Sequence, residues 1–116
     1  MAFKLPYDWA LLDYSGSVSY FERNSGDMSL AISWIDENFW EYTDVLSNEY
    51  AYEYDECANI ILGDDLDWWI GVTPTSMIAV CPGSDRETSL CFDFEMNGSP
   101  SDFTLARMMV SSVMER

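Results

Sequence analysis

The second half of the chain alternates apolar and polar residues in the way that is typical of β-strands. Three runs rich in β-branched and aromatic residues, 67–72, 76–81 and 88–95, are separated by short turn-forming segments. In the last run, apolar residues alternate with a second set that ends on Asp93 and Glu95. One face of that strand is therefore apolar and the other largely acidic. The three runs predict an antiparallel meander.

Two earlier runs, 17–22 and 28–34, alternate in a similar way. The first leads into an Asn-Ser-Gly-Asp segment that is typical of a turn, and it predicts a strand. In the second, Ile32, Ile35 and Phe39 also follow a helical spacing. We therefore expect the second run to begin as a strand and to end as a helix, and we include both runs as candidate strands of the sheet.

Two acidic helices in tandem are predicted over 36–46 and 47–62. Acidic residues recur in each at i, i+4 and i+7, which places three carboxylates on one face of each helix. These residues are Glu37, Glu41 and Asp44 in the first helix and Glu49, Glu53 and Glu56 in the second. Asp36 and Ser47 are the expected N-terminal caps, and Gly63 is the expected C-terminal cap.

A third helix is predicted at the C-terminus, over 100–115. Ser99 and Asp102 have the spacing of a capping box, and Pro100 stands at the first helical position. At the other end of the chain, 6–12 predicts a short helix that begins near a proline. Together these elements predict an α+β fold built on an antiparallel sheet.

The composition predicts a folded chain with one core. Of the 116 residues 48% are hydrophobic and 16% aromatic, and this length matches a single domain over 1–116. The apolar runs fall far short of the roughly 18 residues that a membrane-spanning helix needs. Near the N-terminus, Pro6 and Asp8 stand where a signal peptide would be apolar. We therefore expect a cytoplasmic protein without a membrane span.

The three cysteines, Cys57, Cys81 and Cys91, form no C-x-x-C pair. We expect free, buried thiols. If Cys81 and Cys91 fall side by side on adjacent strands, a disulfide in an oxidising compartment is the alternative.

The chain lacks the residues that most enzymes need. It has no histidine, which removes the commonest general base, the Ser-His and Cys-His nucleophile systems and the commonest zinc ligand together. It has no glycine-rich phosphate-binding motif. The acidic run 64–67 lacks the spacing of a calcium-binding loop. We therefore expect a protein that is not an enzyme and that uses neither a cofactor nor a metal.

Charge is the extreme property of this chain. It has 21 acidic residues against 5 basic ones, which gives a net charge of −16. Direct binding to nucleic acid is excluded as a first interpretation, because such binding depends on cations that displace counterions. Residues 24–85 contain 13 acidic residues and neither Lys nor Arg. This self-repulsion costs stability and so suggests a use, although solubility alone is the simpler explanation.

Carboxylates at i, i+4 on a helix stand about 5 to 6 Å apart, which is comparable to the separation of successive phosphates in a nucleic-acid strand. Aromatic residues between them are typical of binding hot spots. One of the neighbours Trp68 and Trp69 is expected at the surface, because adjacent strand residues point to opposite faces. The expected partner-binding residues are Asp36, Glu37, Glu41, Asp44, Glu49, Tyr50, Tyr52, Glu53, Glu56, Asp64, Asp65, Asp67 and Trp68.

These features predict a small acidic inhibitor that mimics nucleic acid and blocks a basic nucleic-acid-binding protein. In size and charge the chain resembles the small acidic inhibitors that phages direct against host nucleases and CRISPR effectors. The first alternative is an immunity protein that neutralises a cognate nuclease toxin. The second is an acidic adaptor domain that binds a protein partner through its Trp and Tyr side chains.

Overall fold

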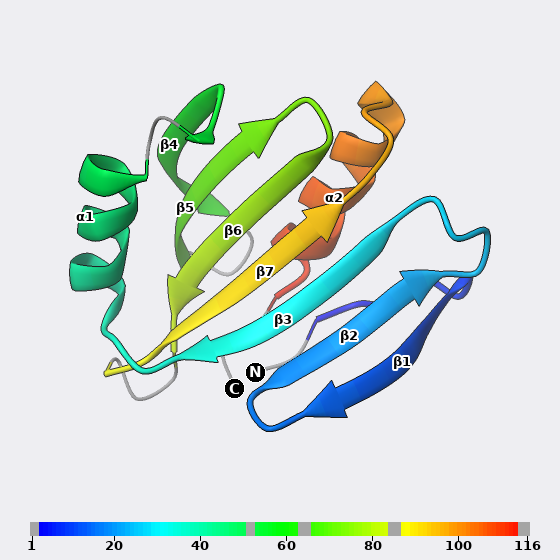
Figure 1. Cartoon of the computed structure of the whole chain (residues 1–116), viewed down its shortest axis with the longest axis horizontal. Helices are drawn as coiled ribbons and strands as arrows, with labels where there is room; N and C mark the ends of the chain where they lie inside the picture. The colour runs from blue at the N-terminus through cyan, green and yellow to red at the C-terminus, as the bar shows by residue number, and fades with distance from the viewer. Residues whose placement is uncertain (1–2, 51–52, 63–65, 84–86, 114–116) are drawn as a thin grey trace.

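The seven strands of this chain form one antiparallel sheet with a helix on each face (Figure 1). The computed structural model describes residues 3–50, 53–62, 66–83 and 87–113. The strands are β1 (Trp9–Ser15), β2 (Val18–Arg23), β3 (Ser29–Ile35), β4 (Glu56–Leu62), β5 (Leu66–Thr73), β6 (Ser76–Pro82) and β7 (Ser89–Glu95). The helices are α1 (Phe39–Glu49) and α2 (Pro100–Ser111). The predicted α+β class with an antiparallel sheet is confirmed.

The sheet consists of two antiparallel meanders, β1-β2-β3 and β4-β5-β6-β7, which are joined where β3 pairs with β7. Its strand order is β1-β2-β3-β7-β6-β5-β4, so the last strand of the chain pairs with the third. Helix α1 therefore connects the middle of the sheet to its far edge, and β1 and β4 are the two open edges (Figure 1).

Five of the predicted strands and two of the predicted helices are present. Runs 17–22, 28–34, 67–72, 76–81 and 88–95 correspond to β2, β3, β5, β6 and β7. Helix α2 begins as predicted, with Ser99 as N-cap and Pro100 in its first turn. Helix α1 matches the predicted 36–46, but its N-cap is Asn38, whose Oδ1 accepts the N–H of Glu41 at 3.0 Å.

The predicted helices over 47–62 and 6–12 are wrong. Helix α1 ends at Glu49, and residues 56–62 form the edge strand β4, where Ile60 pairs with Trp68 of β5. The acidic spacing was compatible with a helix, but the apolar segment after Cys57 is β-prone and gains a ladder of hydrogen bonds by joining the sheet. Residues 9–15 likewise form β1, which pairs with β2.

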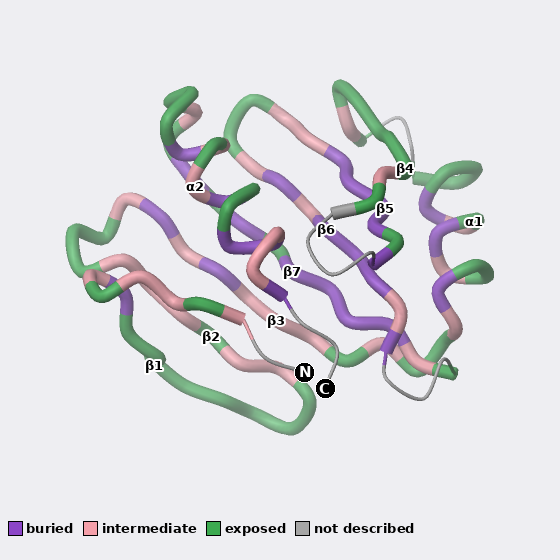
Figure 2. The backbone as a smooth tube through the Cα atoms, turned by 180° about the vertical axis from the view of Figure 1, so that it is seen from behind, coloured by how far each residue is buried: buried purple, intermediate pink, exposed green. Residues whose placement is uncertain are grey.

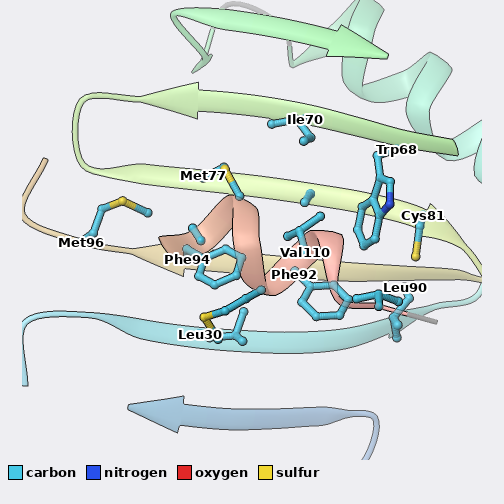
Figure 3. Packing of buried hydrophobic residues seen from close by; sticks show 14 of the residues in the cluster. Leu30, Trp68, Ile70, Met77, Cys81, Leu90, Phe92, Phe94, Met96 and Val110 are labelled. Atoms are coloured by element: carbon cyan, nitrogen blue, oxygen red, sulfur yellow. The ribbon is translucent and has the colours of Figure 1, made fainter. Parts of the chain in front are cut away.

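Both faces of the sheet are buried where a helix covers them. On the α2 face, Trp68, Phe92 and Val110 belong to the main core, and the rings of Trp68 and Phe92 are 5.7 Å apart (Figure 3). On the α1 face, Trp69 belongs to a second cluster with Phe39 of α1. Trp68 and Trp69 are each only 1% exposed. The expectation that one of them lies near the surface is wrong, because each neighbour faces a different helix.

None of the three cysteines is in a disulfide. Cys91 pairs with Val80 and Cys81 pairs with Leu90, so the two buried thiols point to opposite faces of the sheet and cannot form a disulfide. Cys57, expected in the interior, is exposed on β4. Neither helix of the described ranges has the length and apolar character that a membrane crossing requires.

Candidate acidic binding surface

Helix α1 carries the central part of the candidate surface, and apolar packing fixes its orientation. Phe39 and Leu46 are buried against Trp69, Val80 and Cys91 of the sheet. Because these two side chains are seven residues apart, they lie on the same side of the helix. The opposite side of α1 therefore faces solvent.

Three hydrogen bonds hold the ends of α1 in place. The buried Ser89 donates from Oγ to the carbonyl of Glu37 at 2.8 Å, which ties the residue before the N-cap to β7. The indole N–H of Trp69 donates to Ser47 Oγ at 2.9 Å, which ties the last turns to β5. The third is the N-cap bond, in which Asn38 Oδ1 accepts the N–H of Glu41. A rigid helix presents its outward side chains in one geometry, which favours specific binding.

The outward side of α1 and the segments around it carry exposed carboxylates, and none of the described Lys and Arg side chains forms an ion pair with them. Nine of them lie between residues 36 and 67: Asp36, Glu37, Glu41, Asp44, Glu49, Glu53, Asp55, Glu56 and Asp67. The sequence has neither Lys nor Arg in this interval. All but Asp55 belong to the expected set of binding residues. We call these nine residues, with Trp40, the α1 surface.

The tertiary structure brings Asp67 to the N-terminal end of α1. Asn38, Trp40, Glu41, Asp67 and Pro82 are among the residues that line a shallow hollow of about 400 Å³. The ring of Trp40 is 64% exposed, and it packs edge-on against the buried Phe39 with ring centroids 5.0 Å apart. An exposed aromatic ring between carboxylates has the character of a binding hot spot.

The structure does not bring all of the expected binding residues together on one surface. Trp68 was expected to bind a partner, but it is buried in the core on the α2 face. Glu49 ends α1, Glu56 begins β4 and Glu53 lies in the segment between them, so these three carboxylates do not form the predicted helical ridge. Tyr50 is exposed at the C-terminal end of α1. Tyr52, Asp64 and Asp65 lie outside the described residues.

A second acidic area was not predicted as a site. Helix α1 covers only part of its face of the sheet, and β1, β2 and β3 are open on that side (Figure 1). There Glu22 and Glu95 flank Ser29 across three neighbouring strands, and Tyr20 and Asp93 flank Ala31 in the next row. Tyr20, Ala31, Asp93 and Glu95 are among the residues that line a hollow of about 250 Å³. We call Tyr20, Glu22, Asp93 and Glu95 the open sheet face.

Local sequence could have pointed to this open sheet face in part. The alternation along β7 places Asp93 and Glu95 on one side, but the contribution of Glu22 depends on the pairing order of the strands. Desolvation raises the pKa of Asp93 above its ordinary value, and the charge of Glu95 adds to the effect. Asp93 is therefore a carboxylate that gains from a nearby cation.

Two tyrosines, Tyr42 of α1 and Tyr54 ahead of β4, pack against the α1 face of the sheet. Burial raises the pKa of Tyr42 to about 12, and the pKa of Tyr54 also to about 12. The charge of Asp93 contributes to both shifts. The ring of Tyr54 lies over Gly71, where a Cβ would come within 2.9 Å of it, so a larger residue there would displace the ring. Both phenols are neutral at physiological pH and act as packing residues.

The cations of the described chain lie away from the α1 surface. Arg23 is held by the carboxylates of Asp8, Asp27 and Asp102. Lys4 and Arg107 both line a hollow beside α2. Within the described ranges, no three His, Cys, Asp or Glu side chains gather closely enough to hold a metal ion.

Comparison with known proteins finds no match: no protein-family model fits the chain, and no curated protein or solved structure is significantly similar to it. What this protein binds must therefore be inferred from its own surface.

Proposed function

We propose that this protein is a non-enzymatic inhibitor that occupies the basic nucleic-acid-binding site of a nuclease or a CRISPR-type effector. The observation that carries the proposal is the α1 surface, with nine exposed carboxylates and no cation between residues 36 and 67. A groove lined with Lys and Arg to hold phosphates attracts such a surface. Phage anti-defence in the cytoplasm is the setting in which such an inhibitor would act.

The helix supplies the most regular part of the mimic. Its 11 residues span roughly 16 Å at 1.5 Å per residue, and Glu41 and Asp44 are one turn apart. The carboxylate of Asp44 is oriented by Asn48, whose Nδ2 donates to Asp44 Oδ1 at 2.9 Å. Beyond the helix, Asp67 and Glu56 extend the negative surface over the neighbouring strands.

Aromatic side chains would supply the part of the affinity that salt does not screen. Trp40 and Tyr50 are the exposed rings on α1 and at its end. A guanidinium group stacks favourably on an exposed indole, so an arginine of the partner groove fits beside Trp40 and Glu41.

The same surface would serve an immunity protein that neutralises a cognate nuclease toxin, since the physics of the contact is shared. The two roles differ in the number of different proteins that are bound. An immunity protein binds one toxin with very high affinity, whereas a broad mimic blocks several nucleic-acid-binding proteins.

The test is a pull-down from the native host at low salt, followed by a salt gradient. The baits are the wild type and two variants that each remove three negative charges. One neutralises α1 (Glu41→Gln, Asp44→Asn, Glu49→Gln), and the matched control neutralises the open sheet face (Glu22→Gln, Asp93→Asn, Glu95→Gln). We expect a nucleic-acid-handling protein that elutes as salt rises and that the α1 variant fails to retain.

The recovered partner is then tested for nucleic-acid binding in the presence of the wild-type protein. Competition with nucleic acid supports the proposal. A partner that stays bound at high salt, or that binds nucleic acid and this protein together, contradicts it and favours the adaptor role.

A further inference from the structure

Edge strand β1 is unusually apolar for the open edge of a sheet. Half of the exposed large hydrophobic side chains of the described structure, five of ten, lie within residues 7–20. They are Tyr7, Leu11, Leu12, Tyr14 and Tyr20. After Trp9, every residue of β1 is exposed (Figure 2). A concentration of apolar side chains on a surface marks an interaction site.

The backbone of β1 is also available on one side. The strand pairs only with β2, and it contains neither the Lys nor the Pro that usually protects an exposed edge. Its protection consists of a bulge at Leu12 and one charge, Asp13, whose Oδ1 accepts the N–H of Tyr14 at 2.8 Å. This protection is limited, so the edge can accept a further strand.

The charge distribution favours a second copy of this chain as that strand. Residues 3–23 contain three acids and two cations, a net charge of −1, whereas residues 24–85 contain 13 acids and no cation. Strands β1 and β4 lie at opposite ends of the sheet, six strand spacings or roughly 29 Å apart. Two copies that meet at β1 therefore keep their α1 surfaces far from each other, and a basic partner is attracted to the other end.

We propose that two copies of the protein form a symmetric dimer by antiparallel pairing of their β1 strands, which makes the two sheets continuous. A two-fold axis between Leu11 and Leu12 places Ala10 opposite Asp13 of the second copy, so the two Asp13 carboxylates do not face each other. The N–H groups of Trp9 and Tyr14 are bonded within the chain, to the Pro6 carbonyl and to Asp13 Oδ1. The pairing gives partners to the other outward backbone groups of both strands and covers the apolar side chains that flank them.

The other open edge is unsuitable for the same contact. Strand β4 begins at Glu56, and the exposed Glu53 and Asp55 lie within the three residues before it. Pairing two β4 strands would bring the α1 surfaces of the two copies close together, with nine exposed carboxylates on each, and would cost electrostatic energy. This contrast supplies a matched control, since Ile61 on β4 is 66% exposed and Leu12 on β1 is 62% exposed.

The first test is the molar mass in solution, measured by sedimentation equilibrium from about 1 to about 500 µM protein. We expect the mass to rise from 13.3 kDa toward twice that value. Leu12→Lys should weaken the association at least tenfold, and Ile61→Lys should leave it unchanged. A wild type that stays monomeric throughout, or a dimer that Ile61→Lys disrupts and Leu12→Lys does not, overturns the proposal. Because both side chains are exposed, circular dichroism should show both variants folded; Tyr14→Lys replaces Leu12→Lys if it does not.

Salt separates this inference from the proposed function. The dimer joins two negatively charged copies through an apolar edge, so raising the salt from about 50 to about 500 mM should strengthen it. The same change should weaken the complex with a basic partner. The β1 dimer can therefore be confirmed while the proposed binding of a basic partner fails, and the reverse also holds.

Cysteine chemistry gives an independent readout of which edge is used. With Cys57 replaced by serine, Leu12→Cys lies beside the expected two-fold axis and should form a disulfide-linked dimer with oxidised glutathione. In the wild type, the exposed Cys57 lies on the far edge β4 and should not cross-link the two copies. Rapid cross-linking through Cys57, with none through Leu12→Cys, would instead place the contact at β4.

Discussion

The guanidinium Nη1 of Arg23 lies 3.6 Å from the carboxylate of Asp102, and this contact ties β2 to the first turn of α2. The same guanidinium is 3.1 Å from Asp8 and 3.6 Å from Asp27. In a chain with only five Lys and Arg residues, one of them thus contacts three carboxylates around the base of α2. Asp102 is buried, and Arg23 is the cation that contacts it.

Replacing Arg23 with glutamine should lower the thermal unfolding midpoint clearly, because it leaves three carboxylates facing one another around a buried site. Adding Asp102→Asn should restore part of the loss, since it removes the buried charge. Thermal unfolding at pH 7 measures both effects. If Arg23→Gln unfolds at the wild-type temperature, the cluster contributes nothing to stability.

Asp93→Asn should stabilise the protein at pH 7. Partial desolvation of its carboxylate, with the charge of Glu95 beside it, raises the pKa of Asp93 above its ordinary value of 3.8, so the folded state holds this proton more tightly than the unfolded state does. The favourable contribution is complete below pH 3.8 and is lost as the pH rises through the folded-state pKa. The gain in unfolding midpoint should therefore disappear at about pH 3. Glu49→Gln, which removes the same charge from the end of α1, controls for general relief of repulsion.

Tyr42→Phe should protect the protein at high pH. Burial raises the pKa of Tyr42 from 10.0 to about 12, so the neutral phenol contributes stability that is complete below pH 10.0. That contribution is lost as the pH rises through about 12. Urea unfolding at pH 8 and pH 11 measures the difference, with the fully exposed Tyr7→Phe as control. Equal losses in Tyr42→Phe and the wild type would contradict the assignment.

The neighbours Phe39 and Trp40 should separate stability from binding. Phe39→Ala leaves a cavity beneath α1 and should cost about 3 to 5 kcal/mol of unfolding free energy. Trp40→Ala removes an exposed ring and should cost at most about 1 kcal/mol, mainly its contact with Phe39. Urea unfolding measures both. Partner binding should weaken in Trp40→Ala although its fold is retained, and unchanged binding would remove Trp40 from the proposed interface.

Local sequence was sufficient for much of the fold. The alternation along 88–95 determined both a strand and its acidic side, because neighbouring side chains on a strand must point to opposite faces. Ser99 and Pro100 determined the start of α2, because capping satisfies backbone groups within the same few residues. The exposed acids of α1 were predicted for a similar reason, since helical spacing alone decides which residues share a face.

Tertiary structure decided what depends on partners distant in the sequence. Residues 56–62 became an edge strand because β5 offered hydrogen bonds that no local pattern reveals. Trp68 is buried because a helix from the C-terminus covers its face of the sheet, while α1 covers the face of Trp69. The open sheet face joins Glu22 to Glu95 through strand order alone. Periodicity specifies which face a side chain takes, and only the assembled sheet specifies what lies against that face.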